Sequence, residues 1–529
     1  MLTIQDVTYI HPNGDLLFDS LNLVINKQDK TALIGNNGIG KSTLLKILAG
    51  NIQPSSGLVK ATFKPYYVPQ LFGQYNDDSI ARALQLGDKL NALSGILDGN
   101  VTDENMTLLD DDWAIEERCH EAFSRWSLQG LDLSQKMGTL SGGQKTKVFL
   151  AGIMIHRPQI VLLDEPSNHL DMNSRDILYD YIKSTTNTLV VVSHDRTLLN
   201  LLNMVSELSS RGITAYGGNY DFYAGQKMIE TSTLNQDLKS KEKSLHKAKD
   251  MERESLERQQ KLDARGKKKQ EKAGLPTISM NTFKNNAERS TSRIKDVHAG
   301  KINVIAQELT QLRKDLPDIN KMKMGFDNSV LHKGKILIKA NGINFGYADQ
   351  LLWKQVLSFE INSGERIALN GSNGSGKTTL IKMLLGEFEP QAGKIYRSNV
   401  KAIYIDQDYS LIDDSLSVYE QAQKFNSGAL QEHDIKIRLT RFLFTKEYWD
   451  KSCKALSGGE KMRLMLCSLT IENQAPDIIV LDEPTNNLDM QNIEILINAI
   501  NDYKGTLIIV SHDTYFLKQI NVQRLIAIE

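Results

Sequence analysis

The sequence predicts an α/β fold in which two similar domains are joined by a long helical segment. Three observations support this prediction. The same series of motifs occurs twice, in the same order. Within each series, short apolar runs of strand length alternate with helical patterns, which favours a mostly parallel sheet. Between the two series lies a charged stretch, from Gly225 to Lys335, that lacks strand patterning.

Composition limits the class of protein. The chain has 529 residues, of which 40% are hydrophobic, and its net charge is −1. The length suggests about three or four domains of roughly 150 residues each. The three cysteines are scattered and outside any C-x-x-C spacing, which argues against a disulfide framework, a zinc site or an iron–sulfur cluster. We see no secretory signal and no apolar run of the roughly 18–20 residues that a membrane helix needs. We therefore expect a cytoplasmic protein without stable membrane insertion.

Each series begins with a phosphate loop of the form G-x-x-x-x-G-K-[ST]. An apolar strand precedes each loop and a helical pattern follows it. In such a loop, backbone N–H groups turn toward phosphates at a helix N-terminus. The expected ATP-binding residues are Gly35, Asn36, Asn37, Gly38, Ile39, Gly40, Lys41, Ser42 and Thr43 in the first copy, and Gly371, Ser372, Asn373, Gly374, Ser375, Gly376, Lys377, Thr378 and Thr379 in the second.

The lysine and hydroxyl side chains of these loops have separate expected roles. Lys41 and Lys377 are placed to reach the β- and γ-phosphates of ATP. Ser42 and Thr378 are placed to hold Mg²⁺. A chance match to the pattern is possible once, but two matches in a strand–helix context are very improbable.

Paired carboxylates follow the next buried strand in each copy. The apolar runs Ile160–Leu163 and Ile478–Leu481 lead directly into Asp-Glu-Pro. The carboxyl ends of such strands are where α/β proteins place ligands. We predict that Asp164 and Asp482 assist the metal. We also predict that Glu165 and Glu483 polarise the attacking water.

Further polar residues recur at matching positions. His194 and His512 each end a buried strand near the expected γ-phosphate, where a histidine could sense that phosphate and orient water. Lone histidines are usually structural, but the repeated position favours a catalytic role. Gln70 and Gln407 could contact Mg²⁺ or water, although either glutamine alone is weak evidence.

A second small-residue loop precedes a helical pattern in each copy. The residues are Ser141, Gly142 and Gly143 in the first copy, and Ser457, Gly458 and Gly459 in the second. A serine and two glycines at a helix start form an anion site. Because each copy already has a phosphate loop, we predict that this second loop serves the nucleotide of the other copy.

One interval differs between the copies. Gln70 and Ser141 are 71 residues apart, whereas Gln407 and Ser457 are 50 residues apart. The longer interval contains an acidic stretch, from about Ile80 to Gln129, that reads as helical. It predicts either a looser helical subdomain or, less favoured, a small insertion that contacts a partner.

The segment between the copies predicts two antiparallel helices joined by a loop. Its first half carries Glu/Arg and Glu/Lys pairs at i,i+4, which support a helix. Its second half places an apolar residue every three or four positions, at Ile302, Ile305, Leu309, Leu312 and Leu316, before Pro317. The pattern breaks around Gly274, Pro276 and Asn281.

Positive charge gathers at the middle of this segment. From Ala264 to Lys301 it has three acidic residues, Glu271, Glu288 and Asp296, and ten basic ones. A solvated face is the usual meaning of a charge run. Because this run is one-sided and local, a surface for a polyanion, RNA phosphate above all, is the better interpretation. The basic residues are Arg265, Lys267, Lys268, Lys269, Lys272, Lys284, Arg289, Arg293, Lys295 and Lys301.

On these motifs, the sequence resembles the ATP-binding cassette superfamily, and its soluble ABC-F subfamily in particular. The subfamily resemblance rests on the twin cassettes, the absence of membrane spans and the long charged linker. It rests also on the run from Gly217 to Tyr223, which is similar to the subfamily's G-N-Y-x-x-[FY] pattern. It implies two ATPase cassettes at residues 1–224 and 336–529, joined by a helical hairpin at residues 225–335.

The resemblance also implies a function. Two ATP molecules would be sandwiched head to tail, so that Lys41 shares a site with Ser457, and Lys377 with Ser141. ABC-F proteins bind the ribosome, place the linker near the peptidyl-tRNA and act as translation factors, and some confer antibiotic resistance. We therefore expect the ribosome, through rRNA and peptidyl-tRNA, as the partner of a monomeric chain. The alternative is the twin-cassette ATPase subunit of a membrane transporter.

One position departs from the family pattern. The adenine-stacking aromatic matches Tyr347 in the second copy, whereas His11 takes the equivalent position in the first. Adenine stacking in the first site is therefore in question. All other chemical groups occur in both copies, and we expect two competent sites.

Overall fold

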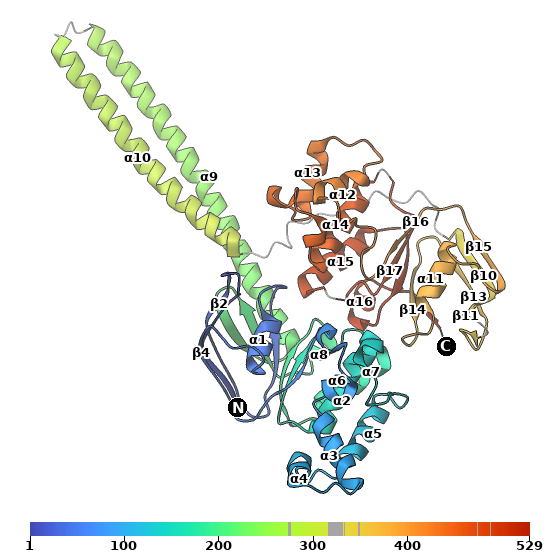
Figure 1. The fold of residues 1–529 in the computed structure, drawn as a ribbon. Coiled ribbons are helices and arrows are strands. Elements are labelled where there is room, and N and C mark those ends of the chain that lie inside the picture. Colours follow the sequence, from blue (N-terminus) through green and yellow to red (C-terminus); the bar gives the residue numbers. More distant parts are fainter. Residues whose placement is uncertain are drawn as a thin grey trace. The chain divides into compact units, whose positions relative to one another are not determined.

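The computed structural model describes residues 1–272, 277–315, 332, 334–347, 350–472, 474–486 and 488–528. For parts of the two long helices between residues 263 and 315 it describes the backbone alone. Figure 1 shows the sheets of both copies and the two long helices that lie between them in the sequence. Among the described residues, no helix combines the length and the apolar character needed to cross a bilayer.

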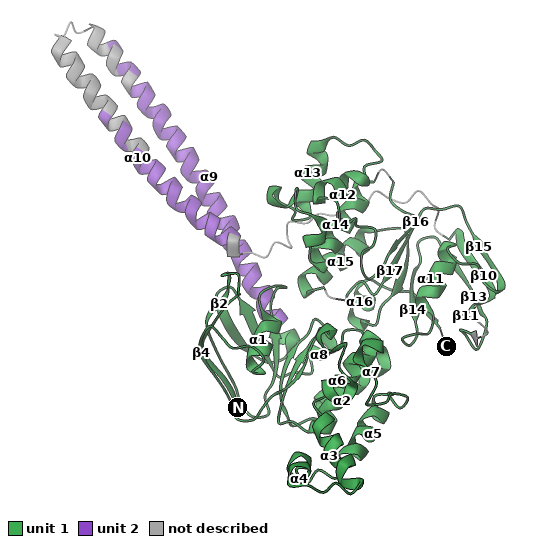
Figure 2. Cartoon of the chain, in the orientation of Figure 1, with its two compact units in different colours: residues 1–223, 321–529 green, residues 224–320 purple. Residues whose placement is uncertain are grey.

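The chain divides into two compact units (Figure 2). One unit comprises residues Met1–Tyr223 and Lys321–Glu529, and it therefore holds both copies. The other comprises residues Ala224–Asn320. The three domain limits expected from the sequence are not tested by this division and stay a prediction.

The first copy is built on two sheets (Figure 1). An antiparallel sheet has the order β2-β1-β4, and a six-stranded sheet has the order β5-β6-β7-β3-β8-β9. The larger sheet is parallel except for the β8–β9 pair. The strands are β1 (Leu2–Ile10), β2 (Leu16–Ile25), β3 (Lys30–Ile34), β4 (Ser56–Ala61), β5 (Tyr66–Val68), β6 (Ile160–Asp164), β7 (Thr188–Val192), β8 (Met204–Ser209) and β9 (Gly212–Gly217).

The centre of the larger sheet is apolar on both faces. Every residue of β6 and β7 is buried, which explains why these strands read as continuous apolar runs. Leu33 of β3, Leu162 of β6 and Leu44 of the following helix α1 belong to one core cluster. This cluster anchors α1, and with it the phosphate loop, against the carboxyl end of the sheet.

The interval between Gln70 and Ser141 in the first copy has two more α-helices than the interval between Gln407 and Ser457 in the second copy. Between Gln70 and Ser141 lie four α-helices, so the expectation of a helical stretch there is confirmed. Its role as a partner contact stays a prediction. The helices are α1 (Lys41–Leu48), α2 (Ile80–Ala83), α3 (Gly87–Leu97), α4 (Asp103–Leu109), α5 (Ile115–Arg125), α6 (Gly142–His156), α7 (Met172–Ser184) and α8 (Arg196–Leu199), with short 3-10 helices at Gly73–Tyr75 and Met137–Thr139.

The second copy repeats the design with a five-stranded parallel sheet of order β16-β17-β18-β14-β19. An antiparallel sheet β13-β10-β15 and a small pair β11-β12 accompany it. The strands are β10 (Ile336–Asn344), β11 (Gly346–Tyr347), β12 (Gln350–Leu351), β13 (Leu357–Asn362), β14 (Arg366–Asn370), β15 (Ala392–Arg397), β16 (Ala402–Ile405), β17 (Ile478–Asp482), β18 (Thr506–Val510) and β19 (Arg524–Ala527). The helices are α11 (Lys377–Leu385), α12 (Val418–Lys424), α13 (Glu432–Arg441), α14 (Gly458–Ile471), α15 (Met490–Asp502) and α16 (Thr514–Gln519), with 3-10 helices at Lys446–Tyr448 and Cys453–Ala455.

Two long helices, α9 (Tyr220–Lys272) and α10 (Thr277–Asp315), form the predicted hairpin (Figure 1). Ion pairs join them, between Lys241 and Glu308 at 2.5 Å and between Arg313 and Glu242 at 2.7 Å. The predicted apolar seam is confirmed as far as it is described, because Leu309 is buried and Ile302, Ile305 and Leu312 are half-buried among exposed neighbours. Leu316 and Pro317 lie outside the described residues.

The predicted break in the hairpin is partly wrong. Gly274 and Pro276 lie outside the described residues, but Asn281 lies inside α10. An asparagine costs a helix interior roughly 0.7 kcal/mol or less relative to alanine, which a helix of this length absorbs.

The basic side chains of the hairpin are described in part. Those that the structure describes are all exposed, namely Arg265, Lys268, Arg289, Arg293 and Lys301. The side chains of Lys267, Lys269, Lys272, Lys284 and Lys295 lie outside the description.

Candidate functional site

The lysine of each phosphate loop folds back over its own loop. Lys41 Nζ donates to the backbone oxygens of Gly35 at 2.7 Å and Asn36 at 3.1 Å. Lys377 Nζ makes the same contacts with Gly371 at 2.7 Å and Ser372 at 3.1 Å. Burial lowers the pKa of both lysines. The two loops therefore have the same geometry, and in each the lysine side-chain nitrogen lies over the backbone of its own loop.

The last glycine of each loop is required by sterics. Gly40 and Gly376 precede α1 and α11 with φ angles of 102° and 90°, in the left-handed region. A Cβ atom on Gly40 would lie 2.8 Å from Leu17, and one on Gly376 would lie 3.1 Å from Leu352. A larger residue at either position would push the loop away from the strand pair that supports it.

The expected metal ligands lie together in the first copy. Ser42 Oγ donates to Asp164 Oδ1 at 3.1 Å. Tyr67, at the end of β5, donates its hydroxyl to the other oxygen, Asp164 Oδ2, at 3.0 Å. Both oxygens of the carboxylate are therefore held in fixed directions. Gln70, three residues after Tyr67, lines the same pocket.

The second copy repeats this arrangement. Thr378 Oγ1 donates to Asp482 Oδ2 at 3.2 Å, and Tyr404 donates to the same oxygen at 2.9 Å. Gln407 lies three residues after Tyr404 and lines the second pocket. Burial raises the pKa of Asp164 and of Asp482. A nearby cation would favour the ionised form of both carboxylates.

Each expected catalytic glutamate faces its histidine. The backbone N–H of His194 donates to Glu165 Oε2 at 3.3 Å, and His194 Nε2 lies 3.3 Å from Oε1. In the second copy, His512 Nε2 lies 3.5 Å from Glu483 Oε1 and 3.4 Å from Lys377 Nζ. The sequence therefore brings these pairs together as predicted, although their catalytic roles stay a prediction.

Burial sets the charge of these groups. It raises the pKa of Glu165, with the like charge of Asp164 adding to the effect. It also raises the pKa of Glu483, to about 7. It lowers the pKa of His194 to about 3 and of His512 to about 4, so both imidazoles are neutral near pH 7. A neutral imidazole can accept a proton or a hydrogen bond from a water molecule.

Both glutamates have an unusual backbone conformation. The φ angle of Glu165 is 49° and that of Glu483 is 48°, which places two residues with long side chains in the left-handed region. Such conformations cost of order 1 kcal/mol or more and gather at functional sites. The backbone N–H of each glutamate donates across to the neighbouring strand, to Val192 and Val510, at 2.8 Å.

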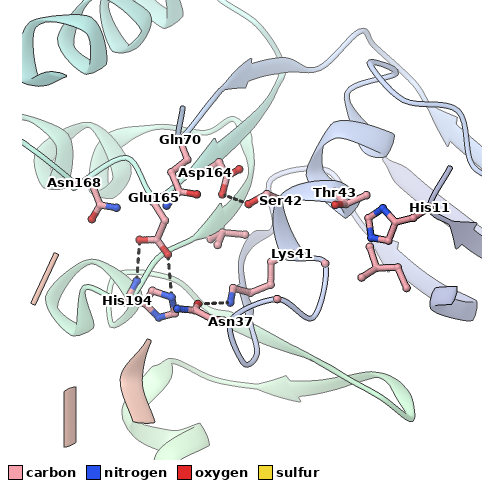
Figure 3. A pocket seen from close by; sticks show the side chains of 14 residues that line it. His11, Asn37, Lys41, Ser42, Thr43, Gln70, Asp164, Glu165, Asn168 and His194 are labelled. Atoms are coloured by element: carbon pink, nitrogen blue, oxygen red, sulfur yellow. Dashed lines mark hydrogen bonds and ion pairs between the residues drawn. The ribbon is translucent and has the colours of Figure 1, made fainter. Parts of the chain in front are cut away.

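The first pocket has a volume of about 390 Å³, and its lining comes from the first copy alone. Figure 3 shows Lys41, Ser42, Asp164 and Glu165 converging on it. His11, at the expected adenine position, lines it beside Leu17. The lining residues are His11, Leu17, Asn37, Gly38, Gly40, Lys41, Ser42, Thr43, Gln70, Asp164, Glu165, Asn168, Val192 and His194.

The second pocket, of about 710 Å³, is lined by residues of both copies. From the second copy come Tyr347, Lys377 and Glu483, and from the first come Ser141 and Arg175. Tyr347 is exposed, and its hydroxyl lies 3.1 Å from Thr379 Oγ1. The structure thus brings the Ser141 loop to the Lys377 loop, as the resemblance implied.

The opposite pairing, of Lys41 with Ser457, stays a prediction. Ser457 caps α14, and Gly458 and Gly459 begin it, but none of the three is among the residues that line the first pocket. The second copy reaches the first phosphate loop through Asp489, whose Oδ2 accepts a 3.4 Å hydrogen bond from Asn37 N–H. The matching contact at the second pocket is from Asn373 Nδ2 to the backbone oxygen of His169, at 2.9 Å.

Two kinds of residue that contact the site residues were missed by sequence reasoning. Tyr67 and Tyr404 orient the aspartates, and their equal spacing before Gln70 and Gln407 could have revealed them. Arg175 was missed because its neighbours come from the other copy, which no spacing along the chain predicts.

The pockets fit a nucleotide with a divalent cation. Serine or threonine hydroxyls, carboxylates and glutamine amides are oxygen ligands that suit Mg²⁺. Among the described residues, Glu165 Oε1 and His512 Nδ1 are buried without a hydrogen-bond partner, since the nearby His194 ring is not in hydrogen-bonding geometry. Both residues line the pockets, where water and phosphate are expected.

Comparisons with known proteins agree with this geometry. The ABC transporter family model matches residues 18–168 and 355–486, which is more than half of the chain. The chain is 29% identical to the ATP-binding protein Uup of Haemophilus influenzae, over 95% of this chain and 75% of that protein. It is 29% identical to ABC transporter F family member 5 of Arabidopsis thaliana, over 96% of this chain and 72% of that protein.

A solved structure shares the fold. It is the crystal structure of the complex of the archaeal ribosomal stalk protein aP1 and the archaeal ribosome recycling factor aABCE1. The match has a TM-score of 0.61 at 20% sequence identity, and it covers 99% of this chain and 87% of that chain.

Proposed function

The chain belongs to the ATP-binding cassette family and is an ATPase of the ABC-F type, and from this premise we propose that it acts on the ribosome. In the proposed cycle, two ATP molecules bind between the copies, which stand head to tail. Binding moves the hairpin into an RNA cavity, and hydrolysis releases it. The observation that carries the proposal is a long hairpin with exposed basic side chains, which lies in the sequence between two phosphate-loop sites.

The second pocket supports the two-ATP arrangement. The N-terminus of α6, capped by Ser141, and the Lys377 loop line the same cavity. Helix N-termini favour anions, so a phosphate between the two loops would be bound from both copies. We propose the matching pair, Lys41 with Ser457, for the first site.

The carboxylate and histidine of each site would prepare the attacking water. Glu165 accepts a hydrogen bond from the backbone N–H of His194, and Glu483 from that of His512. The raised pKa of each glutamate is closer to the value that suits a general base near neutral pH. Neutral His194 and His512 would hold the water or the γ-phosphate in line. Lys41 and Lys377 would neutralise charge on the phosphate oxygens.

The expected Mg²⁺ site would complete each pocket. Ser42, Gln70 and Asp164 would hold the ion in the first pocket, and Thr378, Gln407 and Asp482 in the second. When bound, Mg²⁺ neutralises negative charge on the phosphates. Tyr67 and Tyr404 would keep the aspartates oriented toward it.

The hairpin supports an RNA partner. Exposed lysines and arginines bind phosphate backbones by charge, without base-specific contacts. One solved relative of the same fold is described as a ribosome recycling factor. We propose that the tip of the hairpin lies near the peptidyl-tRNA, and that the chain acts in the cytoplasm, as a monomer, as a translation factor or as a ribosome protection protein that confers antibiotic resistance.

Sedimentation with ribosomes tests the proposal. The Glu165→Gln/Glu483→Gln variant should bind ATP but hydrolyse it slowly, so it should remain in the ATP-bound state. We expect it to comigrate with ribosomes in a sucrose gradient when ATP is present and to stay at the top without ATP.

The matched control is Lys41→Ala/Lys377→Ala, which should bind ATP weakly and fail to comigrate under either condition. If the glutamine variant binds ATP yet never comigrates, and instead fractionates with membranes, the transporter-subunit alternative replaces this proposal. If it hydrolyses ATP at nearly the wild-type rate, the assignment of the two glutamates is wrong.

A further inference from the structure

The arginine that follows the histidine of the first site contacts the second copy. Arg196 stands two residues after His194 and begins the short helix α8. Its Nη2 donates to Glu494 of α15 at 2.7 Å, and its Nη1 donates to the hydroxyl of Tyr515 of α16. The guanidinium group also lies over the ring of Tyr515, 4.3 Å from the ring centroid. Arg196 therefore binds two helices of the second copy at once.

This contact joins the two segments that carry the histidines of the sites. Tyr515 stands three residues after His512, much as Arg196 stands two residues after His194. His194 lines the first pocket and His512 lines the second. Each histidine is followed by an aspartate that caps the next short helix, α8 or α16. The helices that begin directly after the two histidines are therefore held to each other by one side chain.

The same arginine contacts the first residue of the hairpin. The guanidinium group of Arg196 lies 5.6 Å from the ring centroid of Tyr220, within the range of a cation–π interaction. Tyr220 begins α9, and only 6% of it is exposed. It belongs to the run from Gly217 to Tyr223, which lines neither nucleotide pocket. This run belongs to the same compact unit as both copies. Arg196 thus has one partner in the hairpin helix and two in the second copy.

The first turn of α9 is also fixed to the first copy. The N–H of Asp221 donates to the side-chain oxygen of Asn200, the C-terminal cap of α8, at 2.9 Å. The hydroxyl of Tyr223 donates to Glu207 of β8 at 3.1 Å. Strand β8 pairs with β3, which leads into the first phosphate loop. Helix α9 then continues without interruption to Lys272. A displacement of α8 therefore acts directly on the start of the hairpin.

The matching position of the second copy carries a different residue. Two residues after His512 stands Thr514, whose short side chain is exposed. The arginine therefore occurs in the copy whose last strand, β9, leads into the hairpin. Arginine suits this position, because its planar group can stack on aromatic rings while its several N–H groups donate to other partners.

We propose that Arg196 is a positioning residue which passes the ATP-dependent approach of the two copies to the first turn of the hairpin. When ATP draws the copies together, Glu494 and Tyr515 move Arg196, and Arg196 moves Tyr220 with it. Coupling between distant parts of a protein is carried by such chains of packed side chains and rigid elements. This inference rests on the proposed function, since it assumes that ATP binds between the copies and that the hairpin responds.

Amide exchange at the first turn of α9 tests the inference. The parent protein is Glu165→Gln/Glu483→Gln, which is expected to hold ATP without rapid hydrolysis. We would compare the parent with the same protein carrying Arg196→Met. Hydrogen–deuterium exchange would be measured with and without ATP at two segments, the first turn of α1 and the first turn of α9. The first segment reports nucleotide binding, and the second reports the response of the hairpin.

The matched control is Arg118→Met in the same parent. The side chain of Arg118 is 17% exposed, against 15% for Arg196, and it also forms a close ion pair. Its partner, Asp112, belongs to the first copy. The control therefore removes a similar arginine that joins neither the second copy nor α9 in its hydrogen bonds and ion pairs.

In the parent, ATP should slow exchange at both segments. Arg196→Met should keep the protection of α1 within about twofold of the parent and reduce the ATP-dependent change at α9 about fivefold or more, the lower end of the usual coupling between sites. Arg196→Lys should restore this change in part, because it keeps the charge but loses the planar group. Arg118→Met should behave like the parent at both segments.

A second variant keeps the test decisive if Arg196→Met does not fold. The side chain of Glu494 is 46% exposed, so Glu494→Gln should leave the fold intact. It should reduce the ATP-dependent change at α9 about threefold, because the bond to Tyr515 remains. The same protection of α1 is required of it.

An ATP-dependent change at α9 that Arg196→Met leaves intact would overturn the inference. Equal losses of protection at α1 and α9 would also overturn it, and would leave Arg196 as a residue that nucleotide binding needs. A parent in which ATP leaves α9 unchanged overturns it as well, whether or not that parent comigrates with ribosomes. If α9 responds to ATP through Arg196 but the parent never binds ribosomes, the proposed ribosomal function is wrong and the inference stands.

Discussion

At the scale of single residues, the chemistry depends on carboxylates that are buried more deeply than carboxylates usually are. Glu165 and Asp164 are buried with 7% and 1% exposure, whereas Glu483 is partly buried, with 16% of its side chain exposed. Burial of an ionised carboxylate is unfavourable, so each site trades folding free energy for a base with a pKa nearer to neutral.

This cost should be visible in thermal unfolding. The pKa of Glu483 is about 7 in the folded chain against an ordinary value of 4.5. Because the folded value is raised, the contribution of the protonated carboxyl to stability is fully present below about pH 4.5 and is lost as the pH rises through 7. Glutamine cannot ionise. We therefore expect nucleotide-free Glu483→Gln to gain about 3 kcal/mol relative to the wild type between pH 4.5 and pH 8.

Melting temperatures at pH 5 and pH 8 measure this gain. Glu121→Gln, at an exposed carboxylate of the first copy, is the control and should show no such trend. A stability difference for Glu483→Gln that is the same at both pH values would contradict the raised pKa.

The tyrosines that hold the aspartates should tune metal affinity. Removing both hydroxyls, in Tyr67→Phe/Tyr404→Phe, leaves Asp164 and Asp482 with fewer hydrogen bonds and freer to turn. Loss of a group that orients a metal ligand typically weakens metal binding by about 10- to 100-fold. We expect the Mg²⁺ concentration for half-maximal ATPase activity to rise about tenfold at saturating ATP.

A control for this experiment is Tyr216→Phe, a tyrosine of β9 that lines neither pocket. An unchanged Mg²⁺ requirement in the double variant would mean that the serine and threonine hydroxyls alone suffice to orient the aspartates.

The sequence predicted most site residues because their chemistry needs a fixed local pattern. Lys41 and Ser42 must follow a glycine turn, and Glu165 must end a buried strand, so spacing along the chain finds them. Tyr67 and Arg175 act through contacts formed only when distant segments meet. Their residue types alone carry no comparable signal.

At the scale of elements, strands and helices around the motifs were predicted well. The fully buried strands β6 and β18, and the helix starts capped by Ser141 and Ser457, have strong local sequence signals that agree with the structure. Asn281 was assigned wrongly because turn-forming residues were given more weight than the helical pattern around them.

The seam of the hairpin gives a test at this scale. Leu309 is 3% exposed, whereas most of its neighbours on α10 are exposed. Leu309→Asp places a charge at that position, and loss of a buried leucine alone costs about 2–5 kcal/mol. We expect faster amide exchange across α9 and α10, measured by hydrogen–deuterium exchange, with the exchange of β6 and β17 unchanged.

Val304→Asp is the matched control, because Val304 lies on the same helix and is 55% exposed. Equal effects from the two substitutions would show that a charge anywhere on α10 disturbs the hairpin, and that the seam has no special role.

At the scale of the whole molecule, charge is distributed unevenly. The chain has a net charge of −1, yet the middle of the hairpin sequence is strongly basic. Binding to RNA phosphates should therefore depend on salt even though the average charge of the protein does not suggest it.

Replacing Lys268, Arg289 and Arg293 with glutamine should weaken the binding of the ATP-trapped variant to ribosomes and flatten its salt dependence. Each lost phosphate contact lowers the slope of log K against log salt by about 0.7–0.9, so we expect a change of about 2. Binding measured at several KCl concentrations gives the slope.

The control replaces Lys243, Lys247 and Lys249, which are exposed on α9 away from the middle of the hairpin sequence. If the control flattens the slope by the same amount, the salt dependence reflects the total charge of the protein rather than the basic middle of the hairpin.

The left-handed backbone at Glu165 and Glu483 also affects which substitutions the protein would accumulate under selection. Glycine is the residue that this conformation favours, so Glu165→Gly should relieve strain while it removes the base. A screen for thermal stability alone would therefore tend to remove both glutamates that we propose as general bases. Selection for activity has to oppose that tendency twice in every molecule, once in each copy.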